Sequence, residues 1–304
     1  MKSFLAAAIQ MNSQPDLARN MDQAGEAVML AARQGALFVT LPENFAFLGS
    51  ETEKHRLAEP ISEAVLRQVP KWAKEYGIWL LAGGFPVRTE AGSAYEAGSK
   101  SGKMFSEKIG MKQSKAAAKV FNRAIVADPS GEIVARYDKI HLFDVAISDE
   151  EQYRESDLVT PGRPTPIVFD IPGDKKKSDK DGIRVGLSIC YDVRFPELYR
   201  RLSDMDADIL CVPAAFTLPT GEAHWETLLR ARAIENSCYV IAPAQTGRHG
   251  KKRFTYGHSL IIDPWGSILA NAGPSPGMIL AEINPEHVRA VRQKLPSLHH
   301  RVLH

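Results

Sequence analysis

Short apolar segments alternate with longer segments of helical spacing along the first part of the chain. Apolar runs at 4–11, 36–42 and 78–85 predict buried strands. Between them, residues 16–34 and 61–76 carry apolar positions three and four residues apart, which predicts two amphipathic helices. Strands that alternate with helices in this way predict an α/β fold.

The alternation returns in the second half of the chain. Residues 119–128 and 133–137 predict a hairpin, because Pro129-Ser130-Gly131 supplies a turn between them. No linker divides the sequence, so we expect a single domain over residues 1–304. It carries a long excursion at about 90–118 and a C-terminal extension from about 285. Further strands and helices are predicted at 182–190, 207–214, 223–236, 238–242, 257–263 and 267–270.

Composition narrows the class of partner. The 304 residues carry a net charge of +2 with no strongly basic block, so we expect neither nucleic acid nor a membrane surface as partner. No apolar run approaches the roughly 18 residues of a membrane span, and the first residues lead straight into a strand pattern without a signal peptide. Only three cysteines occur, Cys190, Cys211 and Cys238, which favours a reducing cytoplasm over a disulfide framework.

Cys190 ends a β-branched run, and a proline suited to the first turn of a helix follows at Pro196. This predicts a strand, a sharp elbow and a helix, with the thiol at the carboxyl end of the strand. The backbone N–H groups of Tyr191 and Asp192 are then expected to form an oxyanion hole. The alternative is a buried structural cysteine, since free cysteine is among the most buried residue types.

Glu43 and Lys139 also stand just past predicted strands. If the sheet is continuous, both can meet Cys190 at one edge. A carboxylate in a partly dry pocket can take the thiol proton, and an ammonium favours thiolate and stabilises an oxyanion. The alternatives are an N-capping glutamate and a surface lysine.

Three segments resemble the signature motifs of the nitrilase superfamily, the carbon–nitrogen hydrolases. They are Leu41-Pro42-Glu43-Asn44, the segment 137–144 and the segment 186–197, in the family's order. The segments 221–235, 256–259 and 263–266 resemble the Nit-type branch. The resemblance implies a four-layer α-β-β-α sandwich, a homodimer or higher homo-oligomer, and no metal or cofactor.

The resemblance also implies a role for each motif residue. Glu43 would be general base and then general acid, Lys139 would stabilise the tetrahedral intermediate, and Cys190 would be the nucleophile that forms a thioester. Many family members carry a second glutamate before a serine, and Arg154-Glu155-Ser156 matches it. Glu155 is therefore the candidate for orienting Lys139 and the attacking water. Cys211 and Cys238 lie inside predicted strands and are assigned to the core.

The loop at 244–259 resembles the branch that acts on deaminated glutathione. This implies a small linear α-keto amide as substrate, with release of ammonia. Because such a substrate is a dicarboxylate, cations are expected in its pocket. The candidates for substrate binding are Tyr191, Asp192, Arg194, Thr217, Thr220, Arg248 and His249. The alternatives are a salt bridge of Arg194 with Glu197 or Asp192, and plain solvent exposure of Arg248 and His249.

Three other functions stay open at this point. One is an ω-amidase acting on α-ketoglutaramate, and another is a nitrilase or N-carbamoyl hydrolase. The third is a catalytically silent scaffold that binds a partner protein, against which the intact triad argues.

Overall fold

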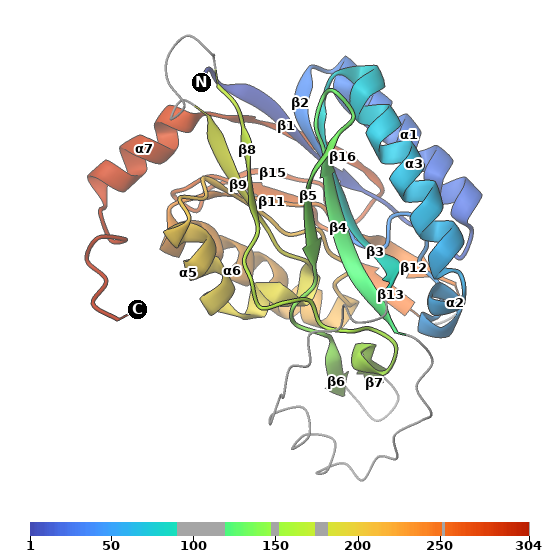
Figure 1. The fold of residues 1–304 in the computed structure, drawn as a ribbon. Coiled ribbons are helices and arrows are strands. Elements are labelled where there is room, and N and C mark those ends of the chain that lie inside the picture. The colour runs from blue at the N-terminus through green and yellow to red at the C-terminus, as the bar shows by residue number, and fades with distance from the viewer. Residues whose placement is uncertain (90–118, 147–151, 174–181, 251–252, 304) are drawn as a thin grey trace.

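Six strands form a first mixed sheet (Figure 1). The computed structural model describes residues 1–89, 119–146, 152–173, 182–250 and 253–303, so the excursion expected at 90–118 lies outside the described residues. In spatial order the first sheet contains β16 (Gly277–Ile283), β1 (Phe4–Gln10), β2 (Ala36–Leu41), β3 (Trp79–Arg88), β4 (Val120–Ala127) and β5 (Ile133–Asp138).

A second six-stranded sheet comes mainly from the second half of the chain. In spatial order it contains β15 (Ile268–Asn271), β14 (Leu260–Ile262), β11 (Tyr239–Ala242), β10 (Ile209–Cys211), β9 (Ile183–Leu187) and β8 (Val168–Ile171). Two hairpins stand apart from both sheets. They are formed by β6 (Asp144–Ala146) with β7 (Gln152–Arg154), and by β12 (Thr246–His249) with β13 (Arg253–Tyr256).

Helices cover the outer face of each sheet. On the first sheet lie α1 (Leu17–Arg33) and α3 (Ala58–Tyr76), and on the second lie α5 (Pro196–Asp204) and α6 (Leu218–Asn236) (Figure 1). Shorter elements are α2 (Glu51–Arg56), η1 (Glu155–Asp157) and η2 (Cys190–Arg194). The expected C-terminal extension forms α7 (Pro285–Lys294), which buries Val288 and Val291.

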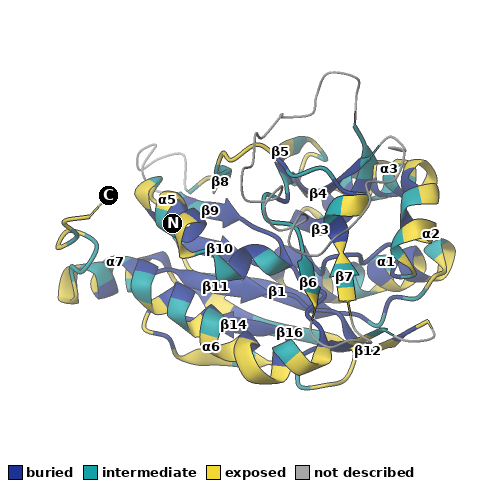
Figure 2. Ribbon diagram, turned by 90° about the horizontal axis from the view of Figure 1, so that it is seen from below, coloured by how far each residue is buried: buried dark blue, intermediate teal, exposed yellow. Residues whose placement is uncertain are grey.

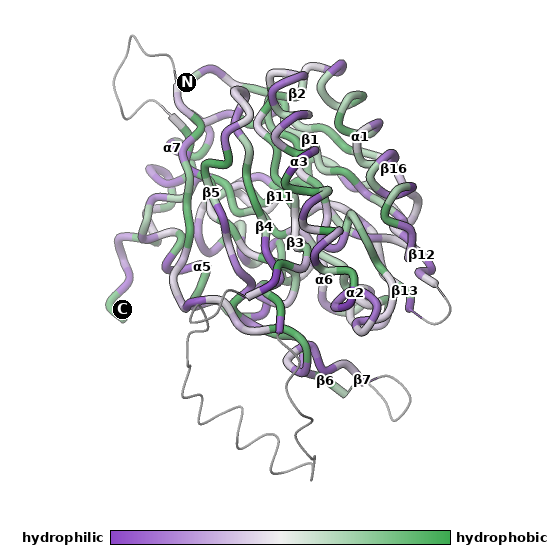
Figure 3. The backbone as a smooth tube through the Cα atoms, turned by 45° about the vertical axis from the view of Figure 1, so that its right-hand side comes forward, coloured by the Kyte–Doolittle hydropathy of each residue, from purple (hydrophilic) through white to green (hydrophobic). Residues whose placement is uncertain are grey.

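The inner faces of the two sheets pack on each other. Phe169 of β8 contacts Phe38 of β2 and Trp79 of β3, with ring centroids 6.0 and 5.8 Å apart. The strands are accordingly buried, while the outward faces of the helices are exposed (Figure 2), and apolar residues concentrate along the strands (Figure 3). The order of layers is helix, sheet, sheet, helix, which confirms the predicted α-β-β-α sandwich.

The structure differs from the predicted elements at two helices, and it contains strands that were not predicted, among them β6, β7, β12, β13 and β16. Helix α2 was not predicted, although Ser50 and Glu53 form a capping box at its start, a pattern that marks helix N-termini. Helix α6 begins five residues before the predicted 223, because Pro219 is tolerated in a first turn. No helix in the described parts of the chain is both long and apolar enough to cross a bilayer.

Candidate active site

Cys190 lies on a tight turn between β9 and α5, as the predicted strand, elbow and helix require. Its φ of 49° is in the left-handed region, which non-glycine residues occupy rarely and often at functional sites. Its backbone N–H donates to the carbonyl of Pro213, just past β10, at 2.9 Å. The side chain is 7% exposed and lines a pocket of about 260 Å³.

Glu43 and Lys139 enter this pocket from the first sheet, past the ends of β2 and β5. The Lys139 Nζ lies 3.2 Å from Glu43 Oε1 and 2.8 Å from Glu155 Oε2. The Glu43 carboxylate also hydrogen-bonds the Cys190 thiol and accepts the Ala215 N–H at 3.0 Å. The four residues therefore converge in one pocket, but between two sheets rather than along one continuous edge.

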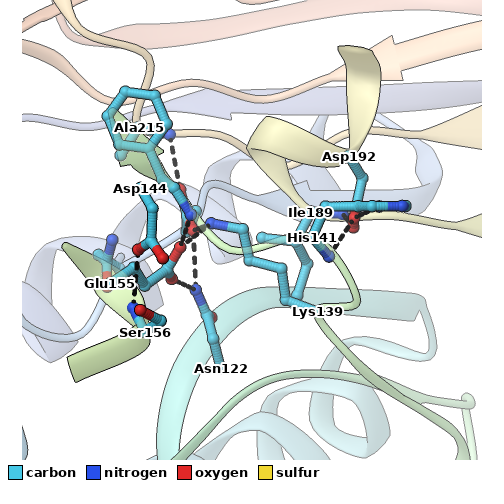
Figure 4. Close-up of polar contacts among 12 residues, drawn as sticks. Asn122, Lys139, His141, Asp144, Glu155, Ser156, Ile189, Asp192 and Ala215 are labelled. Atoms are coloured by element: carbon cyan, nitrogen blue, oxygen red, sulfur yellow. Dashed lines mark hydrogen bonds and ion pairs between the residues drawn. The ribbon is translucent and has the colours of Figure 1, made fainter. Parts of the chain in front are cut away.

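Asn122 joins the two carboxylates and was not among the predicted site residues. Its Nδ2 donates to Glu43 Oε1 at 2.9 Å and to Glu155 Oε1 at 3.1 Å (Figure 4). Gly84 of β3 makes room for this contact, because a Cβ there would lie 2.5 Å from Asn122 Oδ1 and 2.8 Å from Glu43 Cγ. The only signal in the sequence was a polar residue inside an apolar strand.

Burial and the neighbouring charges set the protonation states. Burial opposes ionisation of Glu43, but Lys139, Lys54 and the hydrogen bonds from Asn122 and Cys190 outweigh it and lower the pKa of this carboxyl. Burial likewise opposes the charge on Lys139, yet the carboxylates of Glu155 and Glu43 hold its pKa well above the usual range.

The thiol behaves in the opposite way. Burial first, and then the charge of Glu43, raise the pKa of Cys190 well above that of a free cysteine, against the opposing effect of Lys139. The Lys139 ammonium favours the thiolate, as expected, but burial and the charge of Glu43 outweigh it. The resting site is therefore a carboxylate, an ammonium and a neutral thiol. Such a site suits a general base that takes the thiol proton as the sulfur attacks.

Asp192 does not reach the pocket, which corrects its assignment to substrate binding. It is 0% exposed, and its own N–H donates to the Ile189 carbonyl at 3.1 Å, so it cannot serve an oxyanion. Its carboxylate accepts the N–H of Ile189 (2.9 Å), the hydroxyl of Tyr137 (2.7 Å) and the N–H of His141 (3.1 Å) (Figure 4). Because Tyr137 and His141 stand on either side of Lys139 in the sequence, Asp192 links the turn that carries Cys190 to the segment that carries Lys139.

Two predicted cations also lie away from the pocket lining. The Arg194 guanidinium lies over the rings of Tyr191 and Phe216, 5.7 and 5.2 Å from their centroids, and contacts His224 Nδ1 at 3.3 Å. Arg194 thus contacts His224 instead of forming the alternative salt bridge with Glu197 or Asp192. Arg248 is exposed on β12.

Other predicted contacts do line the pocket. Tyr191, Thr217 and Thr220 are among its lining residues, and the two threonine hydroxyls lie 2.7 Å apart at the start of α6. The lining also contains three cations that were not predicted to face the pocket, Lys54 of α2, Arg154 of β7 and Arg253 of β13. Among the described residues, no group of three or more His, Cys, Asp or Glu side chains is arranged to hold a metal ion.

His249 is buried at 3% exposure and supports the β12–β13 hairpin rather than the pocket. Its Nδ1 lies 2.6 Å from the Ser13 carbonyl, which only accepts, so Nδ1 carries the proton. Its Nε2 then accepts from the Thr255 hydroxyl at 2.6 Å. Both contacts need the neutral ring. Burial, followed by the charge of Arg253, lowers the pKa of His249 to about 4.

We expect His249 to make folding stability fall with acid. Its folded pKa lies below the ordinary 6.5, so its contribution is complete above pH 6.5 and is lost as the pH falls toward 4. The loss amounts to about 3 kcal/mol at about 1.4 kcal/mol per pKa unit. Urea unfolding of the wild type and His249→Gln at pH 7 and pH 4 measures the difference, and parallel pH profiles would contradict it.

Comparison with known proteins gives the same picture along the whole chain. The family model described as carbon-nitrogen hydrolase matches residues 5–293. A protein of Synechocystis named deaminated glutathione amidase is 51% identical over 304 residues, which cover 99% of both chains. The human protein of that name is 39% identical over 298 residues, covering 98% of this chain and 82% of its own.

Solved structures of related proteins share the fold. The Caenorhabditis elegans NitFhit protein superposes with a TM-score of 0.81 at 36% identity, covering 99% of this chain and 66% of its own. Saccharomyces cerevisiae Nit3, described as a member of branch 10 of the nitrilase superfamily, gives 0.76 at 27% identity, covering 97% and 95%. This chain therefore belongs to the carbon–nitrogen hydrolase family, within the nitrilase superfamily, and is a hydrolase that acts on amides.

Proposed function

We propose that this chain hydrolyses deaminated glutathione through a thioester on Cys190. The observation that carries the chemistry is the Glu43 carboxylate, which hydrogen-bonds the thiol and lies 3.2 Å from the Lys139 ammonium. The choice of substrate is supported by 51% identity over the full length to a protein of that name.

In the first half of the reaction, the Cys190 sulfur attacks the amide carbonyl carbon while its proton passes to Glu43. The carbonyl π electrons move to oxygen, and the Lys139 ammonium stabilises the resulting charge, with the Tyr191 N–H as a further donor. Glu43 then returns the proton to the amide nitrogen. The C–N bond breaks, the amine leaves and a thioester remains.

In the second half, Glu43 takes a proton from water as the water oxygen attacks the thioester carbonyl. When the tetrahedral intermediate collapses, the C–S bond breaks and the proton returns to sulfur. Glu155 contributes by position, because its Oε2 accepts from the Lys139 Nζ and from the Phe143 N–H, both at 2.8 Å. These two contacts fix the direction of the ammonium.

The leaving group follows from the structure of the substrate. Deamination of glutathione replaces an amine with a keto group and leaves only secondary amides. Hydrolysis of its γ-amide therefore releases a cysteine-containing dipeptide, and the expected release of ammonia applies only to a primary amide such as α-ketoglutaramate. Both substrates leave the same α-keto dicarboxylate, which makes that acid the product to quantify.

The test compares kcat/KM for deaminated glutathione and α-ketoglutaramate by mass-spectrometric detection of the common product. We expect the former to be preferred by at least about tenfold, because its leaving dipeptide can contribute binding energy outside the acyl pocket, and truncated substrates lose such energy. Preference for α-ketoglutaramate would assign the chain to the ω-amidases. Turnover of a nitrile or an N-carbamoyl amino acid without amide turnover would overturn the proposal, as would no turnover at all, the result expected of a scaffold.

We also propose that residues 1–304 form one domain, that it self-associates through α5 and the C-terminal segment, and that it works in the cytoplasm. The family match over 5–293 supports the first point. Exposed Val302 and Leu303, at 87% and 88%, support the second, and three free cysteines support the third. A monomeric mass by light scattering would contradict self-association.

A further inference from the structure

A second charged cluster lines the pocket that holds Cys190. Lys54 of α2 and Arg253 of β13 both contact Glu51, with Lys54 Nζ at 2.7 Å from Oε2 and Arg253 Nη1 at 3.1 Å from Oε1. The two elements are far apart in the sequence but lie side by side in the fold (Figures 1 and 3). None of these three side chains takes part in a proton transfer of the proposed mechanism.

The cluster carries one excess positive charge, since two cations share one carboxylate. Burial opposes ionisation of Glu51, but Lys54 and Arg253 lower its pKa to about 2, so it stays charged near neutral pH. Lys54 is 6% exposed, and the Arg253 Nε is buried with no hydrogen-bond partner among the described residues. An excess buried cation with an unused donor is stabilised by an incoming anion.

The opposite excess lies at the reacting groups. Glu43 and Glu155 flank the single ammonium of Lys139, which leaves one net negative charge beside Cys190. The two clusters interact electrostatically, because the charge of Lys54 lowers the pKa of Glu43. An anionic substrate is therefore repelled at the carboxylates and attracted at the Lys54 and Arg253 end, which fixes the direction in which it enters.

We propose that Lys54 and Arg253 form a subsite for the carboxylate of the substrate's acyl half, with Glu51 holding the two cations apart. This deepens the proposed function and rests on it. The pocket of about 260 Å³ is at the small end for ligand sites, so it suits the acyl half alone, with the leaving amine directed outward. The same contact holds the acyl chain through both halves of the reaction.

A matched pair of substrates tests the subsite. Glutaramate and pentanamide have the same chain length and differ by a carboxylate against a methyl group. In Arg253→Gln and in Lys54→Gln we expect the ratio of kcat/KM for glutaramate to that for pentanamide to fall by about 10- to 100-fold, as for loss of a charge-assisted hydrogen bond. Arg253→Lys should recover part of the ratio.

Arg230→Gln is the control. Arg230 of α6 does not line the pocket, is 48% exposed and lies 3.9 Å from Glu226, so the ratio should change by less than about twofold. An unchanged ratio in both Arg253→Gln and Lys54→Gln would overturn the subsite, and so would an equal loss on the two substrates.

Binding separates this proposal from the proposed function. Calorimetric titration of glutarate into Cys190→Ala requires no turnover. We expect Arg253→Gln in that background to weaken glutarate binding by about tenfold or more. If the wild type hydrolyses no amide but this difference is found, the proposed function fails and the subsite stands. If glutarate binds both proteins equally, the subsite fails whatever the activity.

Discussion

Cys190→Ala is expected to abolish amide hydrolysis, with kcat reduced on the order of 10⁵- to 10⁶-fold. The proposed mechanism has no other nucleophile, and the neighbouring carboxylate and ammonium act only on the sulfur or on the intermediate it forms. The fold should survive, because the side chain lies at the pocket wall and alanine carries no more backbone strain at a φ of 49° than cysteine does. Turnover of the α-keto amide and far-ultraviolet circular dichroism measure the two expectations.

Cys211→Ala is the matched control. Cys211 is fully buried in β10 and does not line the pocket. Its loss should lower stability by about 1–2 kcal/mol and leave activity per folded molecule unchanged. Acid-quenched wild type should show an acyl adduct by intact mass, and Cys190→Ala should show none. An adduct or residual turnover in Cys190→Ala would place the nucleophile elsewhere.

Glu43→Gln is expected to reduce kcat/KM by about 10²- to 10⁴-fold, the range for loss of a positioned general base. The amide cannot take the thiol proton. One of its oxygens would also become an NH₂ group facing donors, since Oε1 accepts from Asn122 and Lys139, and Oε2 accepts from the Ala215 N–H.

The same substitution should lower the pKa of Cys190. The negative charge of Glu43 raises that pKa, so its removal makes the thiolate easier to form. Thiolate absorbance during a pH titration should therefore rise at lower pH in Glu43→Gln than in the wild type. Glu26→Gln, an exposed change of the same kind on α1, should leave the titration unchanged. An unaltered titration in Glu43→Gln would mean that the carboxylate does not act on the thiol.

Much of the architecture was predictable because local patterns agreed with the global fold. The strands at β1 to β5 and the hairpin turn at 129–131 carry apolar periodicity and turn residues that need no tertiary context. The pairing of strands into two sheets was not predictable from periodicity alone, since a buried strand has the same apolar sequence pattern whichever sheet it joins. Only the resemblance to a family supplied the sandwich.

The sequence by itself determined which residues carry chemistry at strand ends. Glu43, Lys139 and Cys190 stand where apolar runs stop, and their types already indicate acyl transfer. Only the tertiary structure decided which cations face the substrate. On a strand, neighbouring side chains point to opposite faces, so Arg248 is exposed, His249 is buried and Arg253, across the hairpin, reaches the pocket. Long-range packing decides which face of the hairpin is turned toward the pocket. It also buries Asp192, whose carboxylate links the turn that carries Cys190 to the segment that carries Lys139.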